Sequence, residues 1–389
     1  MLDEVIQLDK KYYLNTFGDR LPVCFEKGEG MKLFDDKGNT YYDFLGGIAV
    51  NALGHGHKDF INALKNQLDK VVHTSSLYYI ENQAKLAQKL VENTCAEKAF
   101  FANSGAEANE GAFKLAKIYY YKKGLDKYEI ITLDKSFHGR TLATVAATGQ
   151  EKYQKPYRPL TPGFKQVEPN NFKAIEDAVT DKTAAIMIEL IQGESGVEKL
   201  RKLCDEKDII LIFDEVQTGM GRTGYLFAHQ MYGVEPDIFT SAKALGGGIP
   251  IGAVCAGKKV ASAFEPGDHG TTFGGNPFAT AAGLAVFDIF EKEHLVENAG
   301  KMGKYFKEKL TELQNKYSDK ITDVRNAGLL IGIQLEDSIA KTVFNKLFEN
   351  KMLTSLCGGN TIRIAPPLII KETDIDLFIN TLSSILEEL

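Results

Sequence analysis

The stretch Asp208-Ile-Ile-Leu-Ile-Phe-Asp-Glu215, DIILIFDE, decides the fold class. Its apolar residues follow one another without alternation, so the strand that they predict is buried on both faces. Strands of this kind are typical of parallel sheets that helices cover on two sides. Similar short apolar runs occur on either side of it: KAFFAN (98–103), YEIITLD (128–134), AAIMIELI (184–191), PDIFTSA (236–242) and IGAVCAG (251–257).

Helical patterns separate these runs. In the segment 107–123, EANEGAFKLAKIYYYKK, residues Phe113, Ala116, Lys117 and Tyr120 recur three or four positions apart, which predicts a helix. Strands that alternate with helices are typical of an α/β domain with a mostly parallel central sheet. We therefore predict an α/β fold with such a sheet in its large domain.

After Pro277 the pattern changes. A long helical stretch, 279–317, precedes shorter strand-like and helical segments, and Thr373 with Asp376 predicts a capping box for the last helix. This order of helical and strand-like segments predicts a second, smaller α/β domain. The chain then divides into an N-terminal segment 1–45 that packs with the small domain, a large domain 46–276 and a C-terminal small domain 277–389.

The composition excludes several classes of protein. The 389 residues carry a formal net charge of −6, which provides no basic surface for nucleic acid or an anionic membrane. The apolar runs are too short to cross a bilayer, and the N-terminus lacks the order of a signal peptide. Five cysteines without a CxxC pair suit a reducing, cytoplasmic setting, and the histidine spacing predicts no metal site.

Two acids stand at the end of the predicted strand in residues 208–215. Asp214 and Glu215 emerge at its carboxyl end, where open α/β sheets bind their ligands. An acid at this position could be a metal ligand, a general base or a partner for a ring nitrogen. It could equally only cap the next helix.

A possible phosphate cradle follows another strand. In FANSGAEANEGAFKLAK (101–117), Ser104, Gly105 and Ala106 stand at the start of the predicted helix. Backbone N–H groups and the helix dipole favour an anion there, and a glycine lets it approach closely. The same residues also suit ordinary helix capping.

Three polar or aromatic residues follow the strand at 128–134. Phe137, His138 and Arg140 could be a core residue, a structural histidine and a solvated charge. Alternatively, they offer a stacking face for a planar ring beside an arginine that binds a carboxylate.

Two further segments leave similar alternatives open. Thr271 and Thr272 in HGTTFGGNP (269–277) are turn residues or phosphate donors. Arg363 lies in an apolar strand, NTIRIAPPLII (360–370), where a guanidinium needs an anionic partner from the protein or from a ligand.

Lys243 is the only charged residue in SAKALGGGIPIGA (241–253). Most lysines extend the amine to water, but a lysine can instead lose its charge by forming a Schiff base. A phosphate cradle, a stacking aromatic, an acid for a ring nitrogen and an isolated lysine together meet the needs of pyridoxal phosphate. We therefore predict that Lys243 forms the covalent link to this cofactor.

Several blocks along the chain now show a resemblance to a family. The chain resembles the class III aminotransferases of fold type I over nearly its whole length, most closely the branch that acts on N-acetylornithine. The blocks that resemble the family are GEGMKLFDDKGNTYYDFLGGIAVNALGH (28–55), NSGAEANE (103–110), SFHGRT (136–141), FDEVQTGMGRTG (213–224), SAKALGGGIPIGA (241–253), HGTTFGGNP (269–277) and RIAPPL (363–368).

The resemblance implies a role for each cofactor residue. Lys243 would bind the cofactor and shuttle a proton, Asp214 would pair with the pyridine nitrogen, and Gln217 would lie near the phenolic oxygen. Phe137 would stack on the ring, and Thr272 would reach the phosphate from a second subunit. The complete set of expected cofactor residues is Ser104, Gly105, Ala106, Phe137, His138, Asp214, Glu215, Val216, Gln217, Lys243 and Thr272.

The resemblance also implies substrate contacts. Arg140 would bind the α-carboxylate of acetylornithine and Arg363 that of 2-oxoglutarate. Thr271 would contact substrate, and Glu189 would hold Arg363 in the half-reaction that does not need it. Two arginines with a mobile acid partner would let one pocket accept both substrates.

The implied activity is a ping-pong amino transfer in arginine biosynthesis. N-acetyl-L-ornithine would lose its δ-amino group and leave as N-acetyl-L-glutamate 5-semialdehyde, and 2-oxoglutarate would leave as L-glutamate. The implied assembly is a homodimer with shared active sites and no nucleic-acid or membrane partner. Alternatives are ornithine, succinylornithine or 4-aminobutyrate transamination, an aminomutase on the same fold, and a non-enzymatic cofactor-binding protein.

One segment departs from the family pattern. IQGESGV (191–197) passes directly into EKLRKLCDEKD (198–208), whereas members of the family usually have a longer connection. Either the connection is shorter here or part of it is missing from the sequence. We favour the second interpretation, because so short a helix barely allows a crossover between adjacent parallel strands.

Overall fold

The computed structural model describes residues 1–191 and 196–389 as two compact units. The larger unit contains residues 58–303 and 327–330, and the smaller contains residues 1–57, 304–326 and 331–389. No helix in these described ranges is long and apolar enough to cross a membrane.

Both unit boundaries differ from the boundaries expected at residues 46 and 277. Helix α11 (Pro277–Glu293) packs against α3 (Lys58–Leu68) and α4 (Glu81–Glu92), so it belongs to the larger unit. The segment after Asp43 stays with the smaller unit. There, Phe44 O accepts a hydrogen bond from Ala365 N (2.8 Å), and Ala52 O accepts one from Leu368 N (2.7 Å).

A seven-stranded sheet forms the centre of the larger unit, in the order β4-β10-β9-β8-β7-β5-β6. The run from β9 to β6 is parallel, and β10 is antiparallel to both of its neighbours. The predicted mostly parallel α/β sheet is therefore confirmed. The strands are β4 (Lys98–Ala102), β5 (Glu129–Leu133), β6 (Phe164–Val167), β7 (Thr183–Ile188), β8 (Ile210–Asp214), β9 (Ile238–Ser241) and β10 (Gly252–Ala256).

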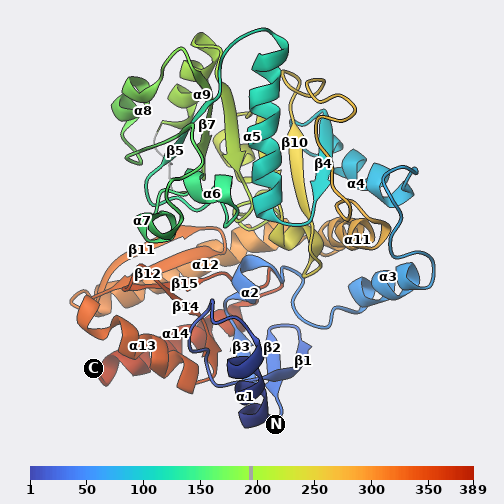
Figure 1. Ribbon diagram of the computed structural model, residues 1–389. Coiled ribbons are helices and arrows are strands. Elements are labelled where there is room, and N and C mark those ends of the chain that lie inside the picture. The colour runs from blue at the N-terminus through green and yellow to red at the C-terminus, as the bar shows by residue number, and fades with distance from the viewer. Residues whose placement is uncertain (192–195) are drawn as a thin grey trace. The chain divides into compact units, whose positions relative to one another are not determined.

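Helices cover this sheet, as the continuous apolar strands predict. Every residue of β7, β8, β9 and β10 is buried. Helix α5 (Gly105–Lys122) lies across one face of the sheet and packs on it through small residues such as Ala108, Ala112 and Ala116 (Figure 1). The remaining helices of the unit are α6 (Leu142–Ala147), α7 (Glu151–Gln154), η1 (Lys155–Tyr157), α8 (Phe172–Ala178), α9 (Val197–Glu206), α10 (Ala228–Tyr232) and η2 (Lys243–Gly246).

The short connection between β7 and β8 does form a parallel crossover. Ala185 pairs with Ile210 and Ile188 with Phe213, and the 10-residue helix α9 lies between the two strands in the chain. A helix of this length therefore allows the crossover, and the interpretation that residues are missing from the sequence stays a prediction. Residues 192–195, which precede α9, lie outside the described part of the chain.

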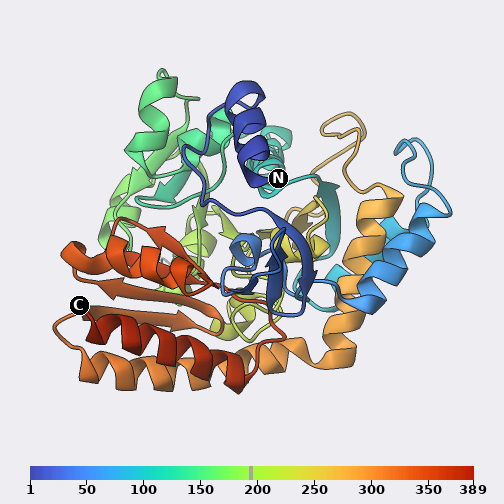
Figure 2. The same cartoon turned by 90° about the horizontal axis from the view of Figure 1, so that it is seen from below.

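The smaller unit has two four-stranded sheets, β1-β2-β3-β13 and β11-β12-β15-β14. Helices α12 and α14 run side by side along it (Figure 2), joined by a hydrogen bond from Tyr305 Oη to Asp376 Oδ1 (2.7 Å). Helix α12 (Leu295–Lys316) belongs to this unit from residue 304 onward. The other elements are α1 (Leu2–Tyr12), β1 (Phe25–Glu29), β2 (Lys32–Asp35), β3 (Thr40–Asp43), α2 (Gly46–Ala49), β11 (Ile321–Ala327), β12 (Leu330–Leu335), α13 (Asp337–Glu349), β13 (Met352–Leu353), β14 (Ser355–Cys357), β15 (Thr361–Ile364) and α14 (Glu372–Glu387).

The predicted cap of the last helix was wrong. Helix α14 begins one residue before Thr373, and Asp374 accepts a hydrogen bond from the backbone N–H of Lys371 (3.0 Å). Asp376 instead binds Tyr305, so the tertiary contact with α12 takes the carboxylate that the capping pattern assigned to the helix start.

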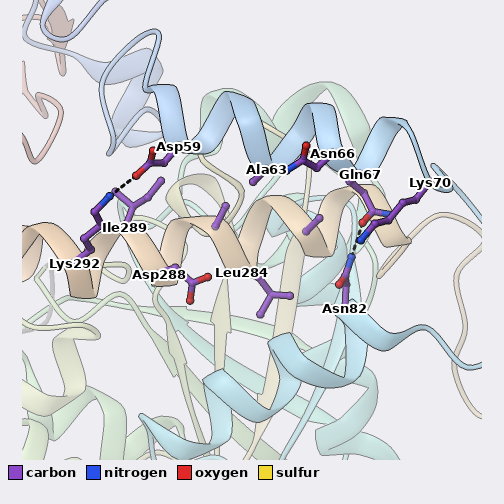
Figure 3. A pocket seen from close by; sticks show the side chains of 12 residues that line it. Asp59, Ala63, Asn66, Gln67, Lys70, Asn82, Leu284, Asp288, Ile289 and Lys292 are labelled. Carbon is purple, nitrogen blue, oxygen red and sulfur yellow. Dashed lines mark hydrogen bonds and ion pairs between the residues drawn. The ribbon is translucent and has the colours of Figure 1, made fainter.

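A groove of about 300 Å³ lies between α3 and α11 (Figure 3). An ion pair between Lys292 and Asp59 (2.6 Å) stands at one end, and a hydrogen bond from Asn82 Nδ2 to Gln67 Oε1 (2.9 Å) stands at the other. The described residues that line it include none of the predicted site residues.

Candidate active site at the carboxyl ends of the strands

The predicted cofactor residues of the larger unit follow the ends of its strands. Ser104 follows β4, Phe137 follows β5, Asp214 ends β8 and Lys243 follows β9. Because β4, β5, β8 and β9 run in the same direction, these ends meet at one edge of the sheet. The parallel topology thus brings together residues that are far apart in the sequence.

Asp214 has the most extensive hydrogen bonding of these residues. Its side chain is only 4% exposed. Oδ2 accepts a hydrogen bond from Asn109 Nδ2 (2.8 Å) and lies 2.8 Å from His138 Nδ1, and Oδ1 accepts one from Val216 N (3.1 Å). These contacts hold the Asp214 carboxylate in one orientation at the strand edge.

His138 lies behind Asp214. It is buried, and its backbone N–H donates to Thr148 Oγ1 (2.9 Å). Burial by itself would lower the pKa of His138, but its hydrogen bond to Asp214 and the charges of Asp214 and Glu189 outweigh burial, so the pKa is raised. This geometry makes His138 a partner of Asp214, and its predicted contact with the cofactor stays a prediction.

The start of α5 has the form of an anion cradle. Ser104 caps the helix, with Oγ accepting a hydrogen bond from Glu107 N (3.1 Å). The first turn of a helix leaves backbone N–H groups without helical partners, and these suit a phosphate. A Cβ at Gly105 would lie 2.7 Å from Val216 Cγ1, so only glycine lets the helix start approach the loop after β8 so closely.

Lys243 occupies the first position of η2, directly after Ala242. Its φ of +47° is a left-handed conformation that non-glycine residues rarely adopt, and such backbone strain is concentrated at functional sites. The partly buried Nζ lies 3.4 Å from Gln217 Oε1. The structure thereby brings together the predicted cofactor-linking lysine and the predicted phenolic-oxygen partner.

Phe137, Arg140 and Tyr153 form an aromatic and cationic cluster. The guanidinium carbon of Arg140 lies 3.9 Å from the ring centroid of Tyr153 and 5.5 Å from that of Phe137. The two rings meet edge to face with their centroids 6.0 Å apart. Phe137 is 42% exposed, so part of its ring is accessible to a planar ligand.

Glu189 is joined to the same loop. It follows β7, and its Oε2 accepts a hydrogen bond from Phe137 N (2.8 Å). Burial raises the pKa of Glu189, and the charge of Asp214 raises it further against the opposing effect of His138. Its predicted partner, Arg363, belongs to the smaller unit, where Nε donates to Ser355 Oγ (3.2 Å). The pairing of Glu189 with Arg363 stays a prediction.

The loop 269–277 places its two threonines differently. Thr271 Oγ1 accepts hydrogen bonds from Gly274 N (3.1 Å) and Asn103 Nδ2 (3.4 Å), so Thr271 stabilises its own turn next to the strand end. Thr272 is exposed. Its side chain is therefore accessible from outside the chain, as a contact to a second subunit requires.

The side chain of Glu215 binds the start of helix α10, although Glu215 lies next to Asp214. Its carboxylate accepts hydrogen bonds from Ala228 N and His229 N at the start of α10, and Oε1 lies 2.7 Å from His229 Nδ1. Any cofactor contact of Glu215 is left to its backbone, and the predicted assignment of this residue stays untested.

Sequence reasoning missed three residues of this region. Asn109 and Thr240 are buried around Asp214, and Tyr153 supports Arg140. Asn109 offered a signal, because it is a polar residue on the same apolar helix face as Ala112 and Ala116. Tyr153 offered none, since only the tertiary fold brings α7 next to Arg140.

These residues fit pyridoxal phosphate. The helix start suits the phosphate, the partly exposed Phe137 suits the planar ring, and the Asp214 carboxylate suits a pyridine nitrogen that carries a proton. The lysine needed for the covalent link stands at the next strand end. Among the described residues, no cluster of His, Cys, Asp and Glu is placed to hold a metal ion.

Comparison with known proteins defines the class of protein to which this fold and site belong. The family model described as aminotransferase class-III matches residues 13–386. The chain belongs to the class III aminotransferases, which are pyridoxal phosphate enzymes of fold type I, so the predicted family, fold and cofactor are confirmed.

The individual relatives are more specific. The chain is 49% identical to the acetylornithine aminotransferase of Methanocaldococcus jannaschii over 99% of this chain and 98% of the relative. It is 47% identical to that of Caldanaerobacter subterraneus over 99% and 100%. Among solved structures, it resembles the acetylornithine aminotransferase from Elizabethkingia anophelis (34% identity, TM-score 0.88, covering 100% of this chain and 99% of that one). It also resembles the ornithine aminotransferase from Toxoplasma gondii (30% identity, TM-score 0.94, covering 100% and 95%).

Proposed function

We propose that this aminotransferase moves the δ-amino group of N-acetyl-L-ornithine to 2-oxoglutarate, as a step of arginine biosynthesis. The products are N-acetyl-L-glutamate 5-semialdehyde and L-glutamate. The observation that supports this most is the 49% and 47% identity, over almost the full chain, to relatives that are acetylornithine aminotransferases. The ornithine aminotransferase structure is less similar in sequence, at 30%.

Two residues perform the cofactor chemistry in this proposal. Bound pyridoxal phosphate supplies an electron sink that stabilises negative charge at the reacting carbon of the substrate. Lys243 holds the cofactor by Nζ and moves the proton at that carbon. Asp214, fixed by Asn109 and His138, accepts the hydrogen bond of the ring nitrogen and keeps that nitrogen protonated.

Arg140 binds the α-carboxylate of the amino donor in this proposal. A guanidinium can bind a carboxylate through two parallel hydrogen bonds. The stacking of Arg140 on Tyr153 supports the assignment, because it limits the orientations of an exposed side chain before substrate arrives. Arg363 binds the α-carboxylate of 2-oxoglutarate, and Glu189 holds Arg363 while the other substrate is present.

The enzyme acts as a homodimer in the cytoplasm in this proposal, with Thr272 completing the phosphate site of the partner subunit. Large apolar side chains exposed on the larger unit support an interface, since Leu77, Tyr78, Tyr79 and Phe273 are 86%, 69%, 107% and 60% exposed. A concentration of exposed aromatic residues is typical of surfaces that another subunit covers.

Substrate preference tests the proposal. The values of kcat/KM for N-acetylornithine, ornithine, succinylornithine and 4-aminobutyrate, each with 2-oxoglutarate, are compared on the purified enzyme, with Lys243→Ala as the inactive control. We expect N-acetylornithine to be the best donor. Faster turnover of ornithine would overturn the proposed substrate, and product formation without any keto acid would indicate an aminomutase.

A further inference from the structure

The side-chain amide of Asn109 uses all of its hydrogen-bonding atoms inside the larger unit. Asn109 is 1% exposed. Its Nδ2 donates to Asp214 Oδ2 (2.8 Å) and to His138 O (2.7 Å), and its Oδ1 accepts from Thr240 Oγ1 (2.7 Å). An amide with two donor hydrogens and one occupied acceptor has a single satisfactory orientation here.

The opposite orientation of this amide is unfavourable. It would direct Oδ1 at the Asp214 carboxylate and at the carbonyl oxygen of His138, so that three acceptors would face one another without a hydrogen. The Thr240 hydroxyl selects the observed orientation by donating to Oδ1. Thr240 also lies opposite Asp214 on the neighbouring strand β9, and Thr240 Oγ1 is 3.4 Å from Asp214 Oδ1.

The hydrogen bonds of Asn109 connect four parts of the fold. Asn109 lies on α5, the helix whose start forms the anion cradle, and its partners lie on β8, on β9 and in the loop after β5. The same loop carries Phe137. The amide therefore ties the acid to the elements that present the phosphate cradle and the stacking ring.

We propose that Asn109 is a positioning residue, which Thr240 orients and which fixes the rotamer and the negative charge of Asp214 for the pyridine nitrogen of the cofactor. This inference rests on the proposed role of Asp214. Asn109 acts through Asp214 and needs no contact with cofactor or substrate. Its function depends on being an amide, because only an amide offers donors to two acceptors and an acceptor to one donor.

The isosteric variant Asn109→Asp separates this role from packing. It keeps the shape but places a second carboxylate at the 2.8 Å contact with Asp214, where two carboxylates share one proton and the acid no longer provides a full negative charge. Thr240→Val is the milder variant, because it removes the donor that orients the amide. Gln67→Leu is the matched control. It removes a buried amide whose hydrogen bonds join it to Val71 O and Asn82 instead of Asn109, Thr240 or Asp214.

Two measurements on the holoenzyme without substrate report on Asp214 directly. The first is the ¹⁵N chemical shift of pyridoxal phosphate labelled at the ring nitrogen, which shows whether that nitrogen is protonated. The second is the rate at which the cofactor dissociates. We expect Asn109→Asp to shift the signal toward the unprotonated form and to accelerate dissociation about tenfold or more. Thr240→Val should cause a smaller change of the same sign, and Gln67→Leu none.

A double variant separates the stability of the fold from the position of the charge. Asn109→Asp combined with Asp214→Asn restores one amide facing one carboxylate, so the resistance to unfolding should recover relative to Asn109→Asp. The ring-nitrogen signal should not recover, because the charge now stands at position 109. Recovery of both the resistance to unfolding and the ring-nitrogen signal would show that a carboxylate at position 109 serves the ring nitrogen as well as one at position 214, which would overturn the inference.

The remaining outcomes distinguish the inference from the function on which it rests. If Asp214→Asn alone leaves the ring nitrogen protonated, the proposed role of Asp214 is wrong. If Asp214→Asn changes the signal while Asn109→Asp and Thr240→Val both leave it unchanged, the role of Asp214 stands and the inference is overturned. Should Asn109→Asp fail to fold, Thr240→Val gives the same decision.

Discussion

Two neighbouring acids, Asp214 and Glu215, have different environments. Each is buried, and each forms a short hydrogen bond with a histidine: Asp214 with His138 at 2.8 Å and Glu215 with His229 at 2.7 Å. Asp214 faces polar side chains at the strand edge, whereas Glu215 accepts the backbone N–H groups at the start of α10. A buried carboxylate and histidine pair therefore does not by itself identify a catalytic site.

The difference lies in what surrounds each pair. Around Asp214, Asn109, Val216 and Thr240 all direct polar groups at one carboxylate next to the predicted cofactor residues. The Glu215 carboxylate accepts a hydrogen bond from the backbone N–H of His229 in α10. The other ring nitrogen of His229, Nε2, lies 3.8 Å from Cys95 Sγ. The second arrangement stabilises the fold, and burial raises the pKa of the Cys95 thiol to about 12, which keeps it protonated.

The strongest test of this comparison replaces Asp214, the acid that we propose to be catalytic. Asp214→Asn preserves shape but removes the negative charge that we assign to the ring nitrogen. We expect kcat/KM for N-acetylornithine to fall roughly 100-fold or more, as when a preorganised electrostatic contact is removed from an active site. Steady-state kinetics at saturating cofactor measure this, and activity within a factor of two of wild type would contradict the assignment.

The matched substitution next to it should affect stability. Glu215→Gln weakens the charged hydrogen bonds to α10 and His229, so we expect the free energy of unfolding to fall by about 2 kcal/mol. Urea unfolding measures the loss. The variant saturated with cofactor should keep nearly the wild-type kcat, and a large loss of kcat without a loss of stability would show that Glu215 is catalytic after all.

A smaller effect is expected at Arg140, which we propose to bind the amino donor. Tyr153→Leu removes the ring on which Arg140 stacks, and we expect KM for N-acetylornithine to rise about two- to fivefold with kcat almost unchanged. Tyr153→Phe keeps the ring and should behave as wild type. An equal rise of KM in both variants would assign the effect to the hydroxyl group instead of the stacking.

The smallest effect concerns His138, the histidine paired with Asp214. The pKa of His138 is raised in the folded protein above the value of about 6.5 for a free side chain, with Asp214 and Glu189 as its acidic neighbours. Its proton therefore contributes stability that is fully present below about pH 6.5 and is lost as pH rises through the raised pKa. As pH rises, the difference in the free energy of unfolding between cofactor-free wild type and His138→Gln should therefore shrink. A difference that grows with pH would contradict a raised pKa of His138.

Much of the fold could be predicted from the sequence because its signals are local. Uninterrupted apolar runs such as 209–213 predict buried parallel strands, and strand ends predict where polar residues gather. The errors arose where local and tertiary interactions compete. Asp376 fits a capping pattern but binds Tyr305. Helix α11 begins where the sequence pattern changes, yet it packs with α3 and α4.

The α/β class, the cofactor chemistry and the residues at the strand ends can be predicted from the sequence alone, because these depend on residue type and position along one element. The different environments of Asp214 and Glu215 and the partners Asn109, Thr240 and Tyr153 become visible only in the folded structure. A hydrogen bond between α5, β8 and β9 depends on how three separate segments pack, and no spacing within any one of them encodes that distance.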